Sequence, residues 1–505
     1  MLKTCLAGGL FGLLLAAQQS LAVTHVKAPT EHGVFVGEQK AGALQFLGIP
    51  YAQQPIGERR WRKPLPPRAH EGERAAIEFG PACPQGKDNF SGTEIGPHNE
   101  ACLYLNIWAP TGYDAPLPVM VWLHGGAHRM GAGSLPLYNG ASLAQRGVVV
   151  VTLNYRLGYL GYFAHPALSE EGESGNFGLL DQSLALEWIQ RNIAAFGGDP
   201  DRVTVFGESA GAVDIQYLMT NPAAEGLFHA AIIQSGGGWA KPATADELQA
   251  KVLKNLDSQG ISENADAKTL RELSPETLVD ALSGRTSIGF GPFIDGELVT
   301  RAPWEAFAEG KQHEVPVLIG SNNWEGNLGR LQPPGFFARL MLRLPPMRGL
   351  YAERGESAQL RYEMAFGDIG FGAPARWVAT QHQRHAPTYL YYFDYVREAR
   401  RSEVPGAGHG AEIVYAFDSI DYSPSNRGAW SSRDKEVSAA MADCWAAFAK
   451  KGKPTFALIE WKPFDAKQPM VMVIDNEPRL TEGHPLANTF DKLEKWFGPG
   501  ALFGP

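Results

Sequence analysis

Short runs of hydrophobic residues, mostly β-branched and bounded by glycine, proline or polar residues, recur along the chain. Runs of this length and composition are typical of strands that are buried on both faces of a sheet. We predict the strongest strands at Val119–Leu123, Gly147–Leu153, Arg202–Phe206, Ala230–Gln234, Val315–Ile319 and Thr388–Tyr395. Because helix-like stretches separate these runs, the pattern predicts a largely parallel sheet with helices on both faces.

Apolar positions that repeat every three or four residues predict helices at Leu179–Phe196 and Asp434–Lys450, each followed by glycine. Two regions break the alternation, near residues 240–312 and 329–386. The first is rich in charged residues and helix formers, and the second mixes Phe, Met, Pro and Arg without strand character. We therefore expect a single α/β domain over residues 23–505, with these two regions as helical insertions above the sheet.

The first 22 residues have the pattern of a secretory signal peptide. Lys3 provides a positive start, residues 6–17 are apolar but too short to span a bilayer, and residues 20–22 (Ser-Leu-Ala) offer a cleavage site. We expect the mature chain to begin near Val23 and to be secreted or periplasmic. No later stretch is apolar over the length that a membrane helix needs, so no stable membrane anchor is expected.

The composition, with 44% hydrophobic and 20% charged residues, is that of an ordinary globular protein. A net charge of −9 argues against a nucleic-acid partner, because no basic stripe offsets it. The densest basic cluster, residues 59–63, is short and is expected to form a solvated or ion-paired face. Cys444 falls on the apolar side of the second predicted helix and is expected in the core.

The strongest chemical signal lies where a β-branched run enters Gly207-Glu208-Ser209-Ala210-Gly211 and leaves into a helix-like stretch. This is the pattern of a nucleophile elbow, a tight turn that exposes one serine hydroxyl above the end of a sheet. Ser209 is therefore the candidate nucleophile. A similar segment at residues 355–359 lacks the second glycine and the preceding strand, so we expect Ser357 on a surface helix.

A serine hydroxyl becomes a strong nucleophile when an imidazole takes its proton and a carboxylate orients that imidazole. In elbow enzymes the order along the chain is serine, acid, histidine, with each partner on a loop that follows a strand. Glu325 lies on the loop after the strand predicted at 315–319. Asp295 is the rival acid, but it precedes that strand in an Asp-Gly pair typical of turns.

His409 is the candidate base. It follows the strand predicted at 388–395 and has glycine on both sides, which lets an imidazole project from a tight loop. The other histidines that we compared either precede Glu325, against the chain order, or lack a preceding strand. They are His165, His229, His313, His382 and His385.

The negative oxygen that forms during acyl transfer needs backbone N–H donors that are fixed in advance. The strand predicted at 119–123 leads directly into His124-Gly125-Gly126-Ala127. We assign the N–H groups of Gly126 and Ala127 as donors, and that of Ala210, directly after the nucleophile, as the third.

Together these pieces resemble the type-B carboxylesterase family, which includes bacterial broad-specificity esterases and the cholinesterases. The resemblance covers essentially the whole mature chain. Besides the elbow and the 124–127 motif, it rests on residues 102–107 (Cys-Leu-Tyr-Leu-Asn-Ile), 154–158 (Asn-Tyr-Arg-Leu-Gly) and 196–200 (Phe-Gly-Gly-Asp-Pro). It implies an α/β-hydrolase fold with a helical cap over the site, and a glutamate as the triad acid, which fits Glu325.

The same resemblance implies a disulfide between Cys83 and Cys102, and a structural ion pair between Arg60 and Glu100 beside the loop that this disulfide closes. In the chain-entropy picture, a bridge across 19 positions contributes about 3 kcal/mol to the stability of the fold.

The chain departs from the family pattern at several positions. Trp324 and Ala101 stand where the family usually has acidic residues, and His128 stands where an aromatic commonly follows the oxyanion motif. Between the two cysteines Phe90 is the only aromatic residue. Because cholinesterases bind quaternary ammonium against a tryptophan in that loop, specificity for choline esters is not expected.

The sequence thus predicts a secreted serine carboxylesterase that forms an acyl-enzyme on a small-molecule ester, with no metal and no organic cofactor. Glu208 is expected to act electrostatically beside the nucleophile, outside the triad. One alternative is a specialised esterase for bulky, aromatic or polycarboxylate esters, with Arg330, Arg339 and Arg343 in the second insertion as candidate contacts. The other is a non-catalytic binding module on the same fold. Monomer and homodimer both remain open.

Overall fold

The structure is a computed structural model. It describes residues 24–86, 95–113, 115–258, 260–282, 289–330, 340, 344–422 and 429–501. The predicted signal peptide at residues 1–22, together with Phe90, Arg339 and Arg343, lies outside the described residues.

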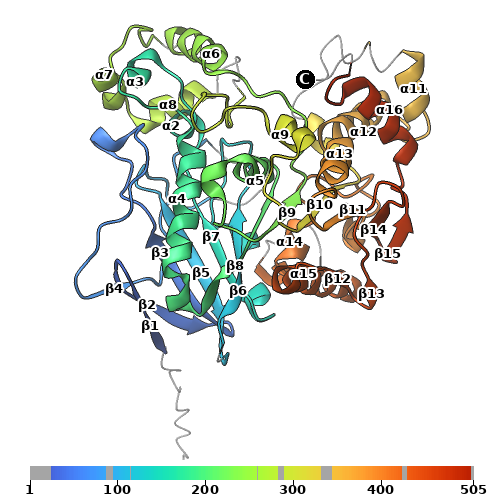
Figure 1. Ribbon diagram of the computed structural model, residues 1–505, viewed down its shortest axis with the longest axis horizontal. Coiled ribbons are helices and arrows are strands. Elements are labelled where there is room, and N and C mark those ends of the chain that lie inside the picture. Colours follow the sequence, from blue (N-terminus) through green and yellow to red (C-terminus); the bar gives the residue numbers. More distant parts are fainter. Residues whose placement is uncertain are drawn as a thin grey trace, which may run out of the picture.

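A large mixed sheet runs through the middle of the molecule (Figure 1). Its strands lie in the order β1-β2-β3-β5-β7-β6-β8-β9-β10-β11-β14-β15, and β4 pairs with β2. In this order, each pair of neighbouring strands from β7 to β14 is parallel. The pairs from β1 to β7, and the last pair, β14 with β15, are antiparallel. The predicted α/β class with a mostly parallel sheet is therefore confirmed.

The strands of this sheet are β1 (His25–Thr30), β2 (Gly33–Lys40), β3 (Ala43–Pro50), β4 (Glu73–Ala75), β5 (Tyr104–Pro110), β6 (Leu117–Leu123), β7 (Val149–Leu153), β8 (Gly198–Glu208), β9 (Ala230–Gln234), β10 (Val317–Asn322), β11 (Thr388–Phe393), β14 (Met470–Ile474) and β15 (Arg479–Glu482). A separate hairpin pairs β12 (Thr455–Phe456) with β13 (Ile459–Glu460).

Alternate residues of the central strands enter two different hydrophobic cores, as the two-residue period of a strand requires. In β6, Val119 and Val121 belong to one core, and Met120 and Trp122 to the other. Helices α4 (Phe177–Asn192), α5 (Ala210–Thr220) and α13 (Ala373–His382) cover the first face. Helices α1 (Ala141–Ala144), α14 (Ile413–Ala416) and α15 (Ser432–Lys451) cover the second.

Two further groups of helices lie at opposite sides of the upper edge of the view (Figure 1). One group shares a core with Trp61 and Phe163 and contains α6 (Ala245–Ser258), α7 (Ala267–Glu272) and α8 (Pro275–Leu282). The other contains α11 (Pro345–Tyr351), α12 (Ala358–Gly367) and α16 (Ala487–Phe497). Among the described residues, the remaining α-helices are α2 (Gly158–Gly161), α3 (Pro166–Ser169) and α9 (Pro303–Glu309). In the second of the two predicted insertion regions, α12 packs on residues 325–330, and α13 packs on β10 and β11.

The predicted helices are present, with small differences at their ends. A 3₁₀ turn, Ile193–Phe196, continues α4 to the predicted stop, and Gly197 follows in the left-handed conformation. Cys444 is fully buried in α15, as expected. Ser357 is exposed, as predicted, but it precedes α12 as its N-cap and accepts a hydrogen bond from the Leu360 N–H. Its hydroxyl therefore satisfies a helix end and does not lie within the helix.

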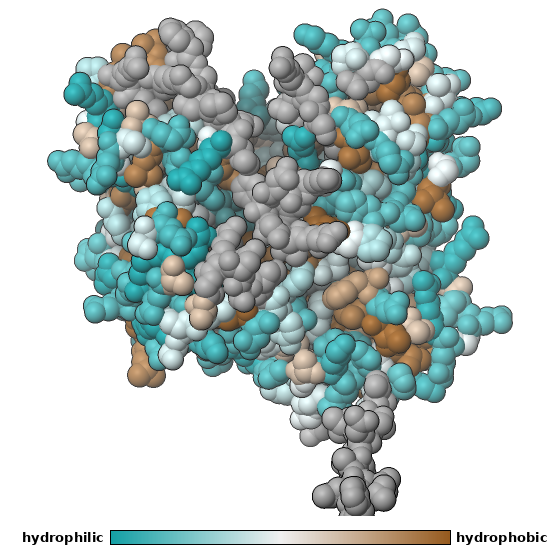
Figure 2. Space-filling model, turned by 180° about the vertical axis from the view of Figure 1, so that it is seen from behind, coloured by the Kyte–Doolittle hydropathy of each residue, from teal (hydrophilic) through white to brown (hydrophobic). Residues whose placement is uncertain are grey.

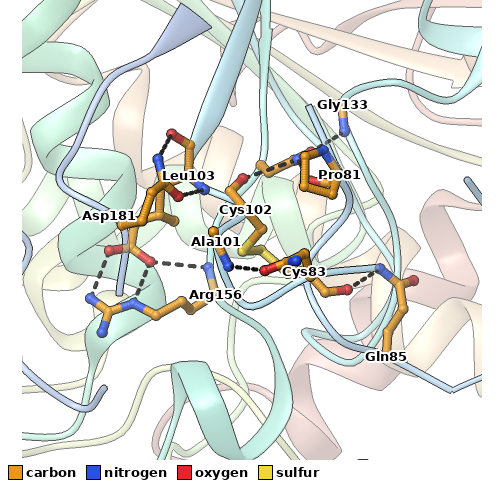
Figure 3. Close-up of a disulfide and its surroundings, with 12 residues drawn as sticks. Pro81, Cys83, Gln85, Ala101, Cys102, Leu103, Gly133, Arg156 and Asp181 are labelled. Atoms are coloured by element: carbon orange, nitrogen blue, oxygen red, sulfur yellow. Dashed lines mark hydrogen bonds and ion pairs between the residues drawn. A yellow bond between two sulfur atoms is a disulfide. The ribbon is translucent and has the colours of Figure 1, made fainter. Parts of the chain in front are cut away.

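The predicted disulfide between Cys83 and Cys102 is formed, with 4.9 Å between the two Cα atoms (Figure 3). The predicted Arg60–Glu100 ion pair is present as well, with two contacts of 2.6 Å. Gln85, beside the disulfide, exchanges two hydrogen bonds with the backbone of Gly131, at 2.8 and 2.9 Å. These contacts connect the disulfide loop to the segment that follows β6.

Seen from behind, the surface is mostly hydrophilic, with hydrophobic residues in small separate patches (Figure 2). Within the described part of the chain, no helix is both long enough and apolar enough to cross a bilayer.

Candidate active site

Ser209 lies at the turn between β8 and α5, with φ 53° and ψ −121°. For a residue other than glycine this backbone geometry costs about 1–3 kcal/mol, and surrounding contacts must hold it. The Ser209 N–H donates to the carbonyl of Gln234 on β9 at 2.9 Å. A Cβ atom at Gly211 would collide with the Leu123 carbonyl oxygen, so the turn fits against β6 only with glycine there. The sequence pattern thus does produce a strained strand-to-helix turn, and the Ser209 residue is partly exposed.

The loop at residues 124–128 leaves the end of β6 beside this turn. A Cβ atom at Gly125 would lie 3.0 Å from the Ser209 Cβ, so the two segments touch. Gly126, Ala127 and His128 have φ values of 109°, 54° and 56°. Turns of this kind can direct successive backbone N–H groups into one concave site. The described residues offer no hydrogen-bond acceptor to the N–H groups of Gly126, Ala127 or Ala210.

Glu325 and His409 form a direct hydrogen bond. The Nδ1 atom of His409 lies 2.6 Å from Oε2 of Glu325, and both side chains are almost completely buried. The other carboxylate oxygen, Oε1, accepts from the Ser235 hydroxyl at 2.5 Å and from the Asn322 N–H at 2.6 Å. Three donors therefore fix Glu325, which in turn orients the imidazole.

The loops that carry these two residues are joined along their length. The Trp324 N–H donates to the Ala407 carbonyl at 3.0 Å, and the Asn322 amide donates to the Gly408 carbonyl at 2.8 Å. The His409 N–H donates to the side chain of Asn327 at 2.8 Å. Since both loops follow parallel neighbouring strands, β10 and β11, they leave the same edge of the sheet and can pair in this way.

The second ring nitrogen of His409 faces the residue next to the candidate nucleophile. Its Nε2 atom lies 3.1 Å from Oε1 of Glu208. Among the described residues neither atom has a hydrogen-bond partner, and no hydrogen bond is formed by the Ser209 hydroxyl. The structure thus brings Glu325, His409 and Glu208 together, but it does not contain a hydrogen bond between Ser209 and His409. Such bonds are often long in the free enzyme and tighten when substrate is bound.

Burial and nearby charge act in opposite directions on His409. Burial alone lowers its pKa, but attraction by Glu208, Glu325 and Glu412 outweighs that effect and raises the pKa to about 9. Burial also raises the pKa of Glu208, to about 8, although the neighbouring imidazole opposes the rise. The two groups are close enough to titrate as a pair.

Sequence reasoning missed several residues of this site. Glu412 is fully buried behind His409 and accepts from the side chains of Gln234 and Asn322, at 3.0 and 2.6 Å. Gln234 is the last residue of β9 and Ser235 follows it, so the rule that led to Glu325 could also have found them. The ring of Phe371, in the π-helical turn 368–372, lies 4.8 Å from that of His409. No sequence signal marks that contact, because it depends on how the turn packs over the site.

The rival acid Asp295 and the candidate substrate contact Arg330 both have partners within the fold. Asp295 accepts the N–H groups of Glu297 and Val299, both at 2.9 Å, as expected of a turn residue. The guanidinium of Arg330 pairs with Glu363 at 3.0 Å and lies over the ring of Trp324. Among the described residues, no group of three or more His, Cys, Asp or Glu side chains could hold a metal ion.

Comparison with known proteins identifies the family of this chain. The model of the Carboxylesterase family matches residues 24–332 and 348–491. The chain belongs to the carboxylesterase family. This confirms the predicted relationship to the type-B carboxylesterases, and the protein is a carboxylic ester hydrolase of that serine-hydrolase family.

Named relatives of this carboxylesterase span nearly the whole chain. The chain is 34% identical to the para-nitrobenzyl esterase of Bacillus subtilis (strain 168), over 93% of this chain and 99% of that protein. The chain is 37% identical to the fumonisin B1 esterase of Sphingopyxis macrogoltabida, over 85% of this chain and 84% of that protein. A solved structure of PNB esterase superposes with a TM-score of 0.81 at 33% identity, covering 93% of this chain and all of that one.

Proposed function

We propose that this carboxylesterase works through a Ser209–His409–Glu325 triad and an acyl-enzyme. Ser209 attacks the ester carbonyl while His409 takes the hydroxyl proton and then delivers it to the departing alcohol. Glu325 holds the imidazole in the required tautomer and stabilises its charged form. A water molecule, deprotonated by His409, then releases the acid and restores the serine.

The observation that carries the proposal is the buried 2.6 Å hydrogen bond between His409 and Glu325, next to the strained turn that presents Ser209. A histidine held in this way by a carboxylate is what a serine nucleophile needs for activation. The backbone N–H groups of Gly126, Ala127 and Ala210 bind the oxyanion. Their lack of an acceptor among the described residues leaves them free to do so.

Glu208 has a separate role in this mechanism. It is a neighbour of Ser209 in the chain, and its carboxylate lies 3.1 Å from the His409 nitrogen that must receive the serine proton. In our mechanism the imidazole turns from Glu208 towards Ser209 when substrate binds. Glu208 then stabilises the imidazolium from the side, while Glu325 holds the other nitrogen.

We further propose that the enzyme is exported as one catalytic domain spanning residues 23–505, after removal of residues 1–22. The charged start, apolar run and small-residue site at the N-terminus support this, as does the disulfide between Cys83 and Cys102. Disulfides persist mainly in secreted and periplasmic proteins, because the cytosol keeps thiols reduced.

The triad is tested by Ser209→Ala, with Ser357→Ala as a matched control from the chain's other Gly-Glu-Ser segment. Ser209→Ala is expected to lower kcat by roughly six orders of magnitude, as loss of a triad nucleophile does elsewhere. Ser357→Ala removes an exposed helix cap and should leave kcat within about twofold. More than a few per cent of activity in purified Ser209→Ala would overturn the proposal.

A second candidate concerns the substrate, and one relative favours it. A fumonisin B1 esterase is among the relatives, which supports a specialised ester as the substrate, and the bulky or polycarboxylate esters considered from the sequence are the class to test. Arg330 is a weak candidate for binding such an anion, because Glu363 already neutralises it. The test compares kcat/KM for a short p-nitrophenyl ester with that for a bulky polycarboxylate ester. A preference for the short neutral ester would reject this specialised role.

A further inference from the structure

His128, directly after the proposed oxyanion donors, makes two contacts that connect separate parts of the fold. Its Nε2 atom lies 2.8 Å from Oδ1 of Asp214 on α5, the helix that begins beside Ser209. Its Nδ1 atom lies 3.2 Å from the carbonyl oxygen of Phe290. The side chain of His128 is 7% exposed and that of Asp214 is fully buried. Neither contact was anticipated from the sequence.

Both ring nitrogens of His128 therefore face oxygen atoms. A backbone carbonyl can only accept a hydrogen bond, so Nδ1 must carry a proton. The Asp214 carboxylate is already used as an acceptor at its other oxygen, Oδ2, by the side chain of Gln182 at 2.5 Å. An ionised carboxylate can likewise only accept, so the contact with Asp214 makes Nε2 a second donor of the ring. The geometry is thus that of an imidazolium ion paired with a buried carboxylate.

The remaining neighbours of His128 leave little freedom to the ring. The ring of Tyr162 meets it edge to face, with 5.0 Å between the centroids. A Cβ atom at Gly291 would lie 2.9 Å from Nδ1, so residues 290–291 pass as close to the ring as glycine allows. His124 lies at the start of the same loop, and burial, with a smaller contribution from the neighbouring His128 charge, lowers the pKa of His124 to about 4. His124 is therefore neutral at the pH of activity and adds no competing charge.

The backbone at this position also requires support. Ala127 and His128 both have positive φ, which residues other than glycine hold only when the surroundings enforce it. The His128 carbonyl accepts from the Gly158 N–H at 2.7 Å, but this bond fixes only one end of the strained segment. The side-chain pair with Asp214 fixes the loop against the same helix that carries the nucleophile.

We propose that His128, as an imidazolium paired with Asp214, is the positioning residue that sets the distance between the 124–128 loop and the Ser209 turn. Through the Phe290 carbonyl it also holds residues 290–291 against that loop. This inference rests on the proposed oxyanion role of Gly126 and Ala127. It extends that role by naming what keeps the donors in place.

The expected kinetic signature follows from where the donors act. Oxyanion donors bind the transition state more strongly than the substrate, so a small displacement lowers kcat and leaves KM nearly unchanged. A purely structural role would instead reduce the fraction of folded enzyme. Titrating active sites with a p-nitrophenyl phosphonate, and dividing the rate by that number, separates the two effects.

Two variants test the proposal from different sides. Asp214→Asn keeps the shape but removes the charge that holds the imidazolium, and Gly291→Ala crowds the ring at Nδ1 while leaving the charge of Asp214 in place. We expect kcat per titrated site to fall about 10- to 100-fold in each, because misplacing such donors has effects of that order, with KM within twofold. The matched control is His382→Asn, a buried histidine bonded to the Val315 carbonyl and to Gln312. It should lower thermal stability but leave kcat per site unchanged.

The charge state is measured separately on the wild-type enzyme, by NMR of protein labelled with ¹⁵N-histidine. The signals of His128, assigned by their loss in His128→Gln, should show a proton on both ring nitrogens at pH 7. A neutral His128 ring, or normal kcat per site in both test variants, would overturn the inference. If Ser209→Ala remained active, the failure would lie in the proposed triad instead. The NMR result would stand even if neither variant folded.

Discussion

Three carboxylates surround the imidazole of His409, and their charge determines how it responds to pH. Glu325 binds Nδ1, Glu208 faces Nε2 and Glu412 lies behind both. A general base must be neutral to accept a proton, so in the proposed mechanism activity is expected above the pKa of His409 and is lost below it. Because that pKa is raised to about 9, kcat/KM should rise through the alkaline range, later than an ordinary histidine near 6.5 would allow.

Glu208→Gln tests this electrostatic account. The variant removes a negative charge that stabilises the imidazolium, so the pKa of His409 should fall and the midpoint of the kcat/KM profile should move to lower pH. We expect a shift of about one unit, equivalent to about 1.4 kcal/mol. The profile is measured from pH 5 to 10 with active sites titrated at each pH.

Glu494→Gln provides the control for that profile. Glu494 is a carboxylate on α16 that pairs with Arg376 and is not among the groups that shift the pKa of His409. The kcat/KM profile of Glu494→Gln should match that of the wild type. An unchanged or higher midpoint in Glu208→Gln would show that Glu208 does not stabilise the charged imidazole.

At this scale, sequence reasoning found the residues that follow a local rule and missed those that depend on packing. Glu325 and His409 were predicted because each follows a strand in the required chain order, and the structure joins them by a hydrogen bond. The contact between Glu208 and His409 depends on the rotamers of the two side chains, which the sequence does not specify, so it could not be predicted. No sequence feature singled out Asp214, because its partner His128 lies 86 positions away.

At the scale of elements, the site depends on the ends of neighbouring parallel strands. The last residues of β6, β8, β9, β10 and β11, and the segments that follow them, supply the polar groups described around His409 and Ser209. The strongly apolar strands among these were predicted from the sequence, and Ala230–Gln234 has the bounds that were predicted. Strand β14 was not predicted, although its apolar run resembles the others. Antiparallel strands β1 to β3 carry mixed polar and apolar residues, so their pairing depends on partners far along the chain.

Helix α15 supports the second face of the sheet and begins with a capping box. The Ser431 hydroxyl accepts from the Asp434 N–H at 3.0 Å, and the Asp434 carboxylate accepts from the Ser431 N–H at 2.8 Å. We expect Ser431→Ala to lower the free energy of unfolding by about 1 kcal/mol, because an N-terminal donor then loses its partner.

Ser432→Ala is the matched control for this helix. Ser432 is the next residue, is exposed, and has no side-chain hydrogen bond among those of the described residues. Its effect in urea unfolding should stay within about 0.5 kcal/mol. Equal effects of the two substitutions would mean that the cap does not stabilise α15.

At the scale of the whole molecule, the disulfide between Cys83 and Cys102 joins two distant segments, and hydrogen bonds of Gln85 connect it to the segment after the 124–128 loop. Cys102 immediately precedes the β5 region, and Gln85, two residues after Cys83, is bonded to the backbone of Gly131 beyond the 124–128 loop. Loss of the disulfide frees the unfolded chain and also loosens the connection to that loop.

Cys83→Ala/Cys102→Ala should therefore lower the free energy of unfolding by about 3 kcal/mol, the value for a loop of this length. Urea unfolding is followed with and without reductant. Reductant should bring the wild type to the stability of the double variant and leave the double variant unchanged. If the free energy of unfolding of the wild type did not change under conditions in which the reductant breaks the bond, the disulfide would not be a source of stability.

The central claim, that one serine in this molecule is the nucleophile, is tested most directly by covalent labelling. The purified enzyme is inactivated with a p-nitrophenyl phosphonate, digested, and the modified peptide is identified by mass spectrometry. We predict one phosphonyl group per chain, on Ser209, with activity lost in proportion to labelling. Full activity without an adduct, or complete inactivation with the adduct on another residue, would contradict the account.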